Sequence, residues 1–94
     1  MGVPSLSKDA YNLTLYPNPT SNGNITISYE LKQDSYIQFK IMDYTGREVM
    51  RLGDEHKTPG SYQQQINTDA FVNGIYLFIA NIDGNIQTIK FIKL

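Results

Sequence analysis

Residues 73–94 read NGIYLFIANIDGNIQTIKFIKL, and this stretch decides the fold. In residues 75–80, isoleucine or leucine alternates with tyrosine, phenylalanine or alanine, so both faces of an extended segment are apolar. A strand with two apolar faces is typical of the interior of a sheet structure. Asp83-Gly84 is a hairpin signal, because glycine tolerates positive φ and aspartate tolerates left-handed geometry. A second strand, residues 86–93, is therefore predicted to pair with the first.

Five further segments alternate apolar and polar residues in the manner of strands. They are residues 11–16, 24–31, 36–42, 47–52 and 61–67. The alternation is clearest in 24–31, which predicts a strand with one buried and one polar face. In 47–52, Val49 is the expected core residue while Met50 and Leu52 fall on the opposite face, which indicates a β-bulge or partial burial. The glutamines of 61–67 indicate an outer strand.

Polar and glycine-bearing segments separate these strands. Residues 53–59 are predicted to form a polar loop, and residues 68–73 to contain one short helical turn from which Phe71 plugs the core. About seven short strands with no long amphipathic helix favour an all-β fold. The prediction is an immunoglobulin-like antiparallel β-sandwich, with a small β-barrel as the alternative topology. The chain lacks the cysteines and tryptophan of antibody domains, so the likeness is architectural only.

The composition argues against several classes of function. The formal net charge of −1 offers no electrostatic case for a nucleic-acid partner. Because the chain has no cysteine, disulfides, thiolate metal sites and cysteine nucleophiles are excluded. No run approaches the roughly 20 consecutive apolar residues that a membrane-spanning helix needs.

The ionisable residues do not form a catalytic or metal-binding pattern. His56 is the only histidine and follows Asp54 and Glu55, but adjacent residues cannot converge on one metal ion without further ligands. With no second histidine and no cysteine, neither a catalytic triad nor a zinc site can be built. The acids Asp43, Asp54, Glu55 and Asp69 are scattered over separate turns and do not suggest the facing carboxylates of a glycosidase. Ordinary surface charge is the expected role of these groups.

Asn81, Asp83 and Asn85 alternate through the turn of the final hairpin and resemble part of a calcium-binding loop. A loop of the EF-hand type needs more ligands and ends in a bidentate acid, which is missing here. Turn formation explains these three residues, so we expect no metal ion and no cofactor.

Two surface roles remain open from the residues alone. Tyr36, Tyr44 and Tyr62 could line a sugar-binding platform, although tyrosines on half-buried strands usually pack their rings and leave the hydroxyl in water. Lys90 and Lys93 are expected to point outward from the last strand, either to protect a sheet edge from aggregation or as part of a recognition surface. The residues thus predict a β-sandwich module that is not an enzyme, with carbohydrate binding or adhesion as an alternative function.

Several short motifs also occur in a characteristic order. They are LYPNP at residues 15–19, DYTGREV at 43–49, GIY at 74–76 and KFIK at 90–93. In this order and spacing, residues 13–94 resemble the C-terminal sorting domain, type A, of proteins exported by the type IX (Por) secretion system of Bacteroidetes. The residues that match the family pattern are Pro17, Asn18, Pro19, Gly46, Val49, Gly74, Tyr76, Lys90 and Lys93.

The resemblance implies that the domain ends a larger cargo protein, such as a protease, adhesin or glycan hydrolase. It implies folding in the periplasm as an immunoglobulin-like sandwich, followed by transport through the outer-membrane translocon with its shuttle components. A surface sortase then removes the domain, and the cargo reaches the outer-membrane surface or the medium, often joined to an anionic lipopolysaccharide. These are the partners that the resemblance implies for this chain.

The same resemblance implies a division of the chain into a linker, residues 1–12, and a sorting domain, residues 13–94. The cleavage site is expected within residues 3–13. Gly46 and Gly74 are expected at turns that a side chain would strain. The Pro-Asn-Pro segment separates a cuttable linker from a protease-resistant sandwich, because cleavage requires an unfolded stretch.

Overall fold

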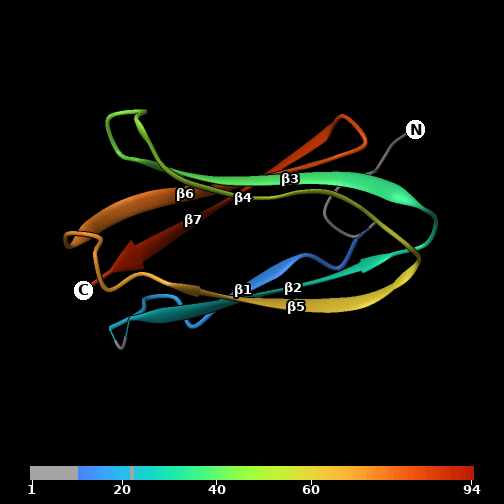
Figure 1. The fold of residues 1–94 in the computed structure, drawn as a ribbon. Helices are drawn as coiled ribbons and strands as arrows, with labels where there is room; N and C mark the ends of the chain where they lie inside the picture. The colour runs from blue at the N-terminus through green and yellow to red at the C-terminus, as the bar shows by residue number, and fades with distance from the viewer. Residues whose placement is uncertain (1–10, 22) are drawn as a thin grey trace, which may run out of the picture.

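The computed structural model of the chain describes residues 11–21 and 23–94 and has seven strands in two antiparallel sheets, which lie face to face (Figure 1). The strands are β1 (Thr14–Tyr16), β2 (Asn24–Leu31), β3 (Ser35–Asp43), β4 (Glu48–Lys57), β5 (Gly60–Asn67), β6 (Gly74–Ile82) and β7 (Asn85–Lys93). One sheet has the strand order β1-β2-β5 and the other the order β4-β3-β6-β7. The predicted antiparallel β-sandwich is confirmed, and the small barrel is wrong.

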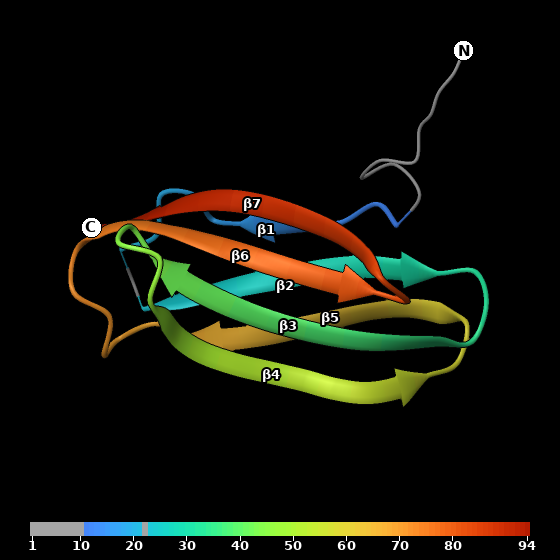
Figure 2. The same ribbon diagram turned by 90° about the horizontal axis from the view of Figure 1, so that it is seen from above.

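The strand order is that of an immunoglobulin-like sandwich. Strands β1, β2 and β5 correspond to strands A, B and E, and β3, β6 and β7 to strands C, F and G of the facing sheet. Strand β4 lies beside β3 and extends that sheet by one strand. The last strand, β7, is a sheet edge and lies along the same side of the sandwich as the edge strand β1 (Figure 2). Strand β5 is the other edge of its sheet, as the glutamines of 61–67 predicted.

Alternate residues of the facing strands form the core between the two sheets. Its buried apolar residues are Leu13, Ile25, Ile27, Tyr29, Leu31, Ile37, Phe39, Ile41, Ile66, Tyr76, Phe78, Ala80, Ile82 and Phe91. The Tyr29 ring meets Phe39 edge-on at a centroid distance of 5.3 Å, and Phe39 packs on Phe78 at 5.2 Å. Burial raises the pKa of Tyr29 to about 12. Strand β2 has the predicted bounds and faces the core with every second residue.

Strand β6 lies between β3 and β7, as predicted for a segment that is apolar on both faces. Only one of its faces is buried in the core, however. The side chains of Tyr76 and Phe78 point inward, whereas Ile75, Leu77 and Ile79 lie on the outside of the sheet, and Ile75 is 41% exposed. A two-layer sandwich has no third layer to cover this outer face, so the apolar outer face is left without an explanation in the packing of the core.

The predicted loop at residues 53–59 is wrong, because β4 continues through Lys57 and pairs with β3 along this stretch. The pairing shifts register between Ile37 and Phe39, and Gly53 takes a φ of +69° opposite this shift. A glycine bulge of this kind lets a polar edge strand continue without an alternating pattern. A second register shift, between Ile41 and Met42, confirms the bulge expected near Val49.

The helical turn predicted for residues 68–73 is also wrong. The described residues contain no helix, and this segment is a turn in which the Phe71 N–H donates to the Thr68 carbonyl at 2.9 Å. Phe71 is half-buried and packs on the Tyr76 ring at 5.0 Å. Accordingly, residues 11–21 and 23–94 include no helix with the length and apolarity needed to cross a membrane.

The N-terminal part of the sandwich begins slightly before β1. Strand β1 is shorter than the predicted segment 11–16, but the Tyr11 carbonyl accepts the Glu30 N–H at 2.7 Å. The Asn12 side chain also donates to the Glu30 carboxylate at 2.9 Å. Tyr11 and Asn12, which belong to the expected linker 1–12, therefore contact the sandwich. The rest of that linker, residues 1–10, lies outside the described residues.

Candidate functional site

The loop after β1 covers part of the outer edge of β7. The Asn18 amide nitrogen donates to the Lys90 carbonyl at 2.9 Å, and the Asn18 side-chain oxygen accepts the Ile92 N–H at 3.1 Å. One side-chain amide thus takes the place of a peptide group in a neighbouring strand. Pro17 and Pro19 flank it, are exposed and each follow a cis peptide bond. The Pro-Asn-Pro motif therefore pairs with the C-terminal strand.

Thr20 continues this pairing toward the end of the chain. Its N–H donates to the Ile92 carbonyl and its carbonyl accepts the Leu94 N–H, both at 2.9 Å, in a parallel bridge opposite Lys93. The Thr20 side chain is fully buried, and its hydroxyl donates to the Asn24 carbonyl at 3.0 Å. Thr20 was not predicted as a site residue. Its position directly after the Pro-Asn-Pro motif is the signal that could have identified it.

Lys93 points into the sandwich, so the prediction that it faces outward is wrong. The residue is 7% exposed, and its ammonium donates to the Thr68 carbonyl at 2.9 Å and the Phe71 carbonyl at 3.2 Å. Lys93 shares the inward face of β7 with Phe91, two residues earlier. The two carbonyls of the 68–71 turn accept hydrogen bonds from the ammonium, which lowers the cost of burying it. Lys90 lies on the opposite face and is exposed, as predicted.

Tyr76 fastens the start of β6 to the same end of the core. Its ring stacks on Phe91 at a centroid distance of 5.5 Å, and its hydroxyl donates to the Val72 carbonyl at 2.5 Å. Burial raises the pKa of this hydroxyl. A buried tyrosine that bonds to the backbone a few residues upstream is a recurrent feature of immunoglobulin-like sandwiches. Gly74, two residues before it, pairs with Lys93 across the hairpin.

The turn between β3 and β4 carries the remaining two motif residues. Gly46 has a φ of +90°, a conformation that favours glycine. The Asp43 carboxylate accepts hydrogen bonds from the Thr45 hydroxyl at 2.6 Å and the Arg47 N–H at 3.0 Å. These bonds, the Thr45 hydroxyl first, lower the pKa of Asp43. Val49 is half-buried against the core at the bulge.

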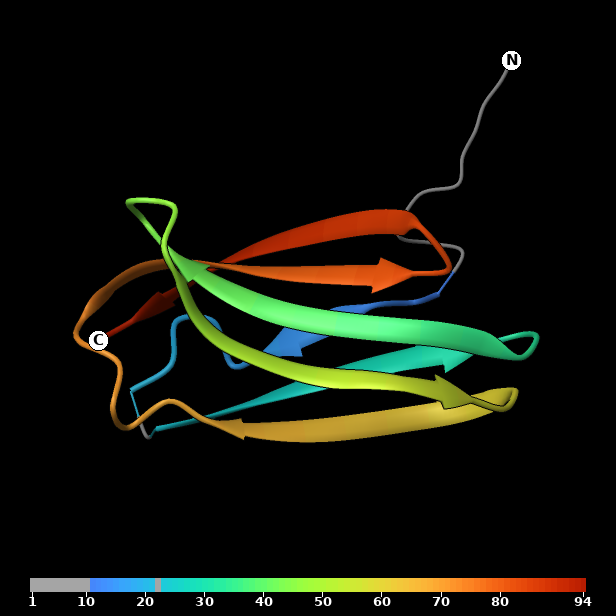
Figure 3. The same ribbon diagram turned by 45° about the horizontal axis from the view of Figure 1, so that its top comes forward.

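All four motif segments gather at one end of the sandwich, around the end of β7 (Figure 3). Asn18 contacts the backbone of β7, Gly74 pairs with Lys93, and β3 pairs with β6 at this end through Asp43 and Tyr76. A cleft of about 450 Å³ lies between the β3–β4 turn and residues 72–76. Exposed apolar side chains lie at this end; they are Tyr44, Val72, Ile75 and Leu94. We refer to it as the motif end.

Other residues considered from the sequence do not form a site. The His56 ring lies against Tyr36 at 4.9 Å, and the Asp54 carboxylate accepts hydrogen bonds from Tyr36 and Gln38. The hydrogen bond to Asp54 raises the pKa of Tyr36. No group of three or more histidine, aspartate or glutamate side chains that could hold a metal ion is found in the described part of the chain.

The three tyrosines of the hypothetical sugar platform are not brought together. Tyr36 and Tyr44 lie at opposite ends of β3, and Tyr62 belongs to the other sheet, where it stacks on Tyr29 at 5.4 Å. Of the three residues of the β6–β7 turn, Asn81 accepts the Gly84 N–H within the turn, as turn formation predicted. The Asp83 carboxylate instead accepts the Tyr36 N–H, and the Asn85 amide donates to the Tyr11 hydroxyl, so these two side chains join the turn to other parts of the domain.

The fold and the motif end define an immunoglobulin-like β-sandwich domain. Its last strand pairs with β6 along one side and, from Lys90 onward, bonds to the loop after β1 on the other. The family described as the secretion system C-terminal sorting domain matches residues 14–94, and the chain belongs to this family. This confirms the resemblance to the sorting domains of type IX (Por) secretion. Neither the curated proteins nor the solved structures yield a match to the chain.

Replacing Asn18 with alanine is expected to lower the free energy of unfolding by about 1–2 kcal/mol, because two hydrogen bonds to β7 are lost at once. Hydrogen exchange measured by NMR should show faster exchange of the Ile92 amide. Asn12→Ala is the control for the Ile92 amide, because the Asn12 side chain donates to Glu30 and not to β7. Its effect on stability is not compared, since Asn12 has a φ of +48°, which alanine disfavours. Unaltered Ile92 protection in Asn18→Ala would contradict this role of the motif.

Proposed function

We propose that the chain is the C-terminal secretion signal of a larger cargo protein, which it directs across the outer membrane through the type IX system. The gathering of the family motifs at one end of the sandwich carries the proposal, together with the family match. A folded signal is recognised by surface shape and needs no catalytic group. The proposed function is therefore not enzymatic, and it requires no cofactor and no nucleic-acid partner.

The cargo passes through the periplasm and then reaches the cell surface or the medium, where a surface sortase removes the domain. Of the expected cleavage region 3–13, Leu13 is buried and Tyr11 is bonded to the sandwich, which argues against cleavage at these residues. We place the cut bond before Tyr11. The translocon, its shuttle components and the sortase are the proposed partners.

Fusion of a reporter to residues 1–94 tests this function in a bacterium with a type IX system. The reporter is expected at the surface or in the medium, and cleavage should release it without the sandwich. A second fusion that lacks residues 86–94 is expected to remain in the periplasm. Export of the truncated fusion at the level of the full fusion would contradict the proposal.

Truncation also removes Phe91 from the core, so loss of export could result from unfolding alone. Lys93→Ala has the same weakness, because the residue is buried. Lys90→Ala is the cleaner surface variant, since the Lys90 side chain is exposed and only its backbone bonds to Asn18. Each variant is therefore compared for export only after its far-UV circular dichroism and thermal midpoint match the parent domain.

A further inference from the structure

The outer face of the β4-β3-β6-β7 sheet carries an apolar row with two lysines beside it. The row consists of Ile75, Leu77 and Ile79, which are alternate outward-facing residues of β6. Lys40 on β3 stands opposite Ile79, and Lys90 on β7 stands opposite Leu77. The lysines thus flank the row from both sides. We refer to the three apolar residues together with Lys40 and Lys90 as the β6 outer row.

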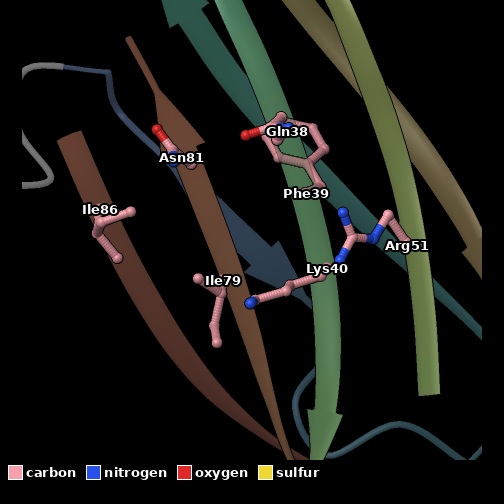
Figure 4. Close-up of a pocket in the computed structure, with 7 residues that line it drawn as sticks. All are labelled: Gln38, Phe39, Lys40, Arg51, Ile79, Asn81 and Ile86. Atoms are coloured by element: carbon pink, nitrogen blue, oxygen red, sulfur yellow. The ribbon is translucent and has the colours of Figure 1, made fainter. Parts of the chain in front are cut away.

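A cleft adjoins each end of the row. At Ile79, a cleft of about 250 Å³ is lined by residues of all four strands of the sheet, among them Lys40 and Ile86 (Figure 4). The Lys40 side chain reaches across this cleft from β3 toward Ile79 on β6 (Figure 4). At Ile75, the row meets the cleft of about 450 Å³ at the motif end. Apolar surface therefore continues along β6 from one cleft to the other.

The charges of this face are unevenly distributed, because the carboxylates of Glu48 and Asp54 both belong to β4. Arg51 on β4 is held by the Glu48 carboxylate at 2.8 and 3.0 Å, so this pair is neutral. Neither Lys40 nor Lys90 has a carboxylate within 4.0 Å among residues 11–21 and 23–94. The row therefore offers a half-buried apolar strip, exposed at Ile75, beside two lysines that make no ion pair within 4.0 Å in the described residues. Lys40 is close enough to Glu48 to contribute to the lowered pKa of that carboxyl, after the larger effect of Arg51. A complementary surface would present apolar side chains beside carboxylates.

We propose that the β6 outer row is the surface through which the domain binds a protein partner, and that the partner presents apolar side chains flanked by carboxylates. This inference rests on the proposed secretion function and adds the face that is recognised. Five residues of extended strand span about 13 Å, so a short partner segment along β6 can reach both clefts. The partner's carboxylates then lie against Lys40 and Lys90.

Charge favours a protein partner over two other occupants. Segments that bind anionic lipid surfaces typically carry clusters of roughly 4–8 basic residues. This face has two lysines without an ion pair among residues 11–21 and 23–94. A second copy of the chain would present the same two lysines in a two-fold contact. The Glu48 and Asp54 carboxylates that it brings are already bonded, to Arg51 and to Tyr36 and Gln38 respectively. An acidic, apolar protein surface is the occupant that satisfies both features of the row.

The test uses the reporter fusion with Lys40→Glu and Lys90→Glu, singly and together, in a bacterium with a type IX system. Lys32→Glu is the matched control, because it makes the same charge change at an exposed residue outside the β6 outer row. We expect the double variant to reduce the exported fraction about tenfold or more, because like charges across an interface are strongly unfavourable. Lys32→Glu should export normally, and so should Lys40→Arg with Lys90→Arg.

The folding of every variant is checked by its urea midpoint. Loss of export is attributed to the surface only for variants that unfold at the same urea concentration as the parent. Normal export of the folded double Glu variant would overturn the inference and leave the secretion function standing. Retention of the parent fusion itself would overturn both. Two further results would overturn the protein-partner inference. One is binding of the parent domain to phosphatidylglycerol vesicles that the double Glu variant loses. The other is dimerisation of the parent domain in sedimentation velocity that the double Glu variant loses.

Discussion

Phe91→Ala is expected to lower the free energy of unfolding by about 3–5 kcal/mol, the range for removing a fully buried phenylalanine ring. Phe91 is 0% exposed and stacks on Tyr76 at 5.5 Å. Loss of the Phe91 ring leaves a cavity between the sheets and removes its stacking with Tyr76. Because small domains are stable by only about 5–15 kcal/mol, much of the margin is lost. The fusion that carries Phe91→Ala is expected to be retained and degraded.

Urea unfolding followed by circular dichroism measures this loss. Ile86→Ala in the same strand is the control, because Ile86 is 59% exposed and should change stability by no more than about 0.5 kcal/mol. A loss below about 1.5 kcal/mol for Phe91→Ala would be under the range for buried rings and would contradict its place in the core.

Lys93→Met is expected to lower the free energy of unfolding by about 2–3 kcal/mol. Methionine preserves much of the aliphatic stem but cannot donate to the Thr68 and Phe71 carbonyls. Hydrogen bonds to a charged group are worth about 1.5–3 kcal/mol, and an acceptor left buried without a donor adds to the loss. The variant should loosen the 68–71 turn together with the end of β7.

Lys90→Met is the control for this substitution, since it changes the same residue type on the exposed face of the same strand. We expect a change within about 0.5 kcal/mol. Burial of an ammonium group opposes folding through lost hydration. An increase in stability for Lys93→Met would therefore show that this desolvation outweighs the two hydrogen bonds, and would contradict a stabilising role of Lys93.

The two lysines of the KFIK motif consequently have different roles. Lys93 bonds the end of β7 to the 68–71 turn, whereas Lys90 belongs to the β6 outer row. A substitution of both at once combines a change in stability with a change in the surface. Export experiments on this motif are informative only when the two are changed separately.

Much of the architecture follows from local patterns. Residues 24–31 alternate strictly and form β2 with those bounds, and Asp83-Gly84 forms the turn of the final hairpin. The extension of β4 through Lys57 was missed, because an edge strand can pair through its backbone while its side chains remain polar. The short helical turn predicted for residues 68–73 is a β-turn-like segment with one hydrogen bond, between Phe71 and Thr68, because the chain must turn at once into β6.

The candidate site is different, because its contacts join residues far apart in the sequence. Asn18 and Lys90 are 72 residues apart, and Lys93 and Thr68 are 25 apart. The alternation in β7 placed Lys93 on the face of Phe91, but its charge argued for the outside. Burial became favourable only because the fold brings the carbonyls of Thr68 and Phe71 to the ammonium.

By itself, the sequence determined the strands, most of the turns and the family, since these depend on residues that are neighbours in the chain. The period-two alternation, the glycine and proline positions and the order of the motifs are all local. Only the tertiary structure decided that the motifs gather around the end of β7, that Lys93 is buried, and that Lys40 and Lys90 flank the apolar row. These arrangements depend on which strands become neighbours, and the packing of the two sheets sets this.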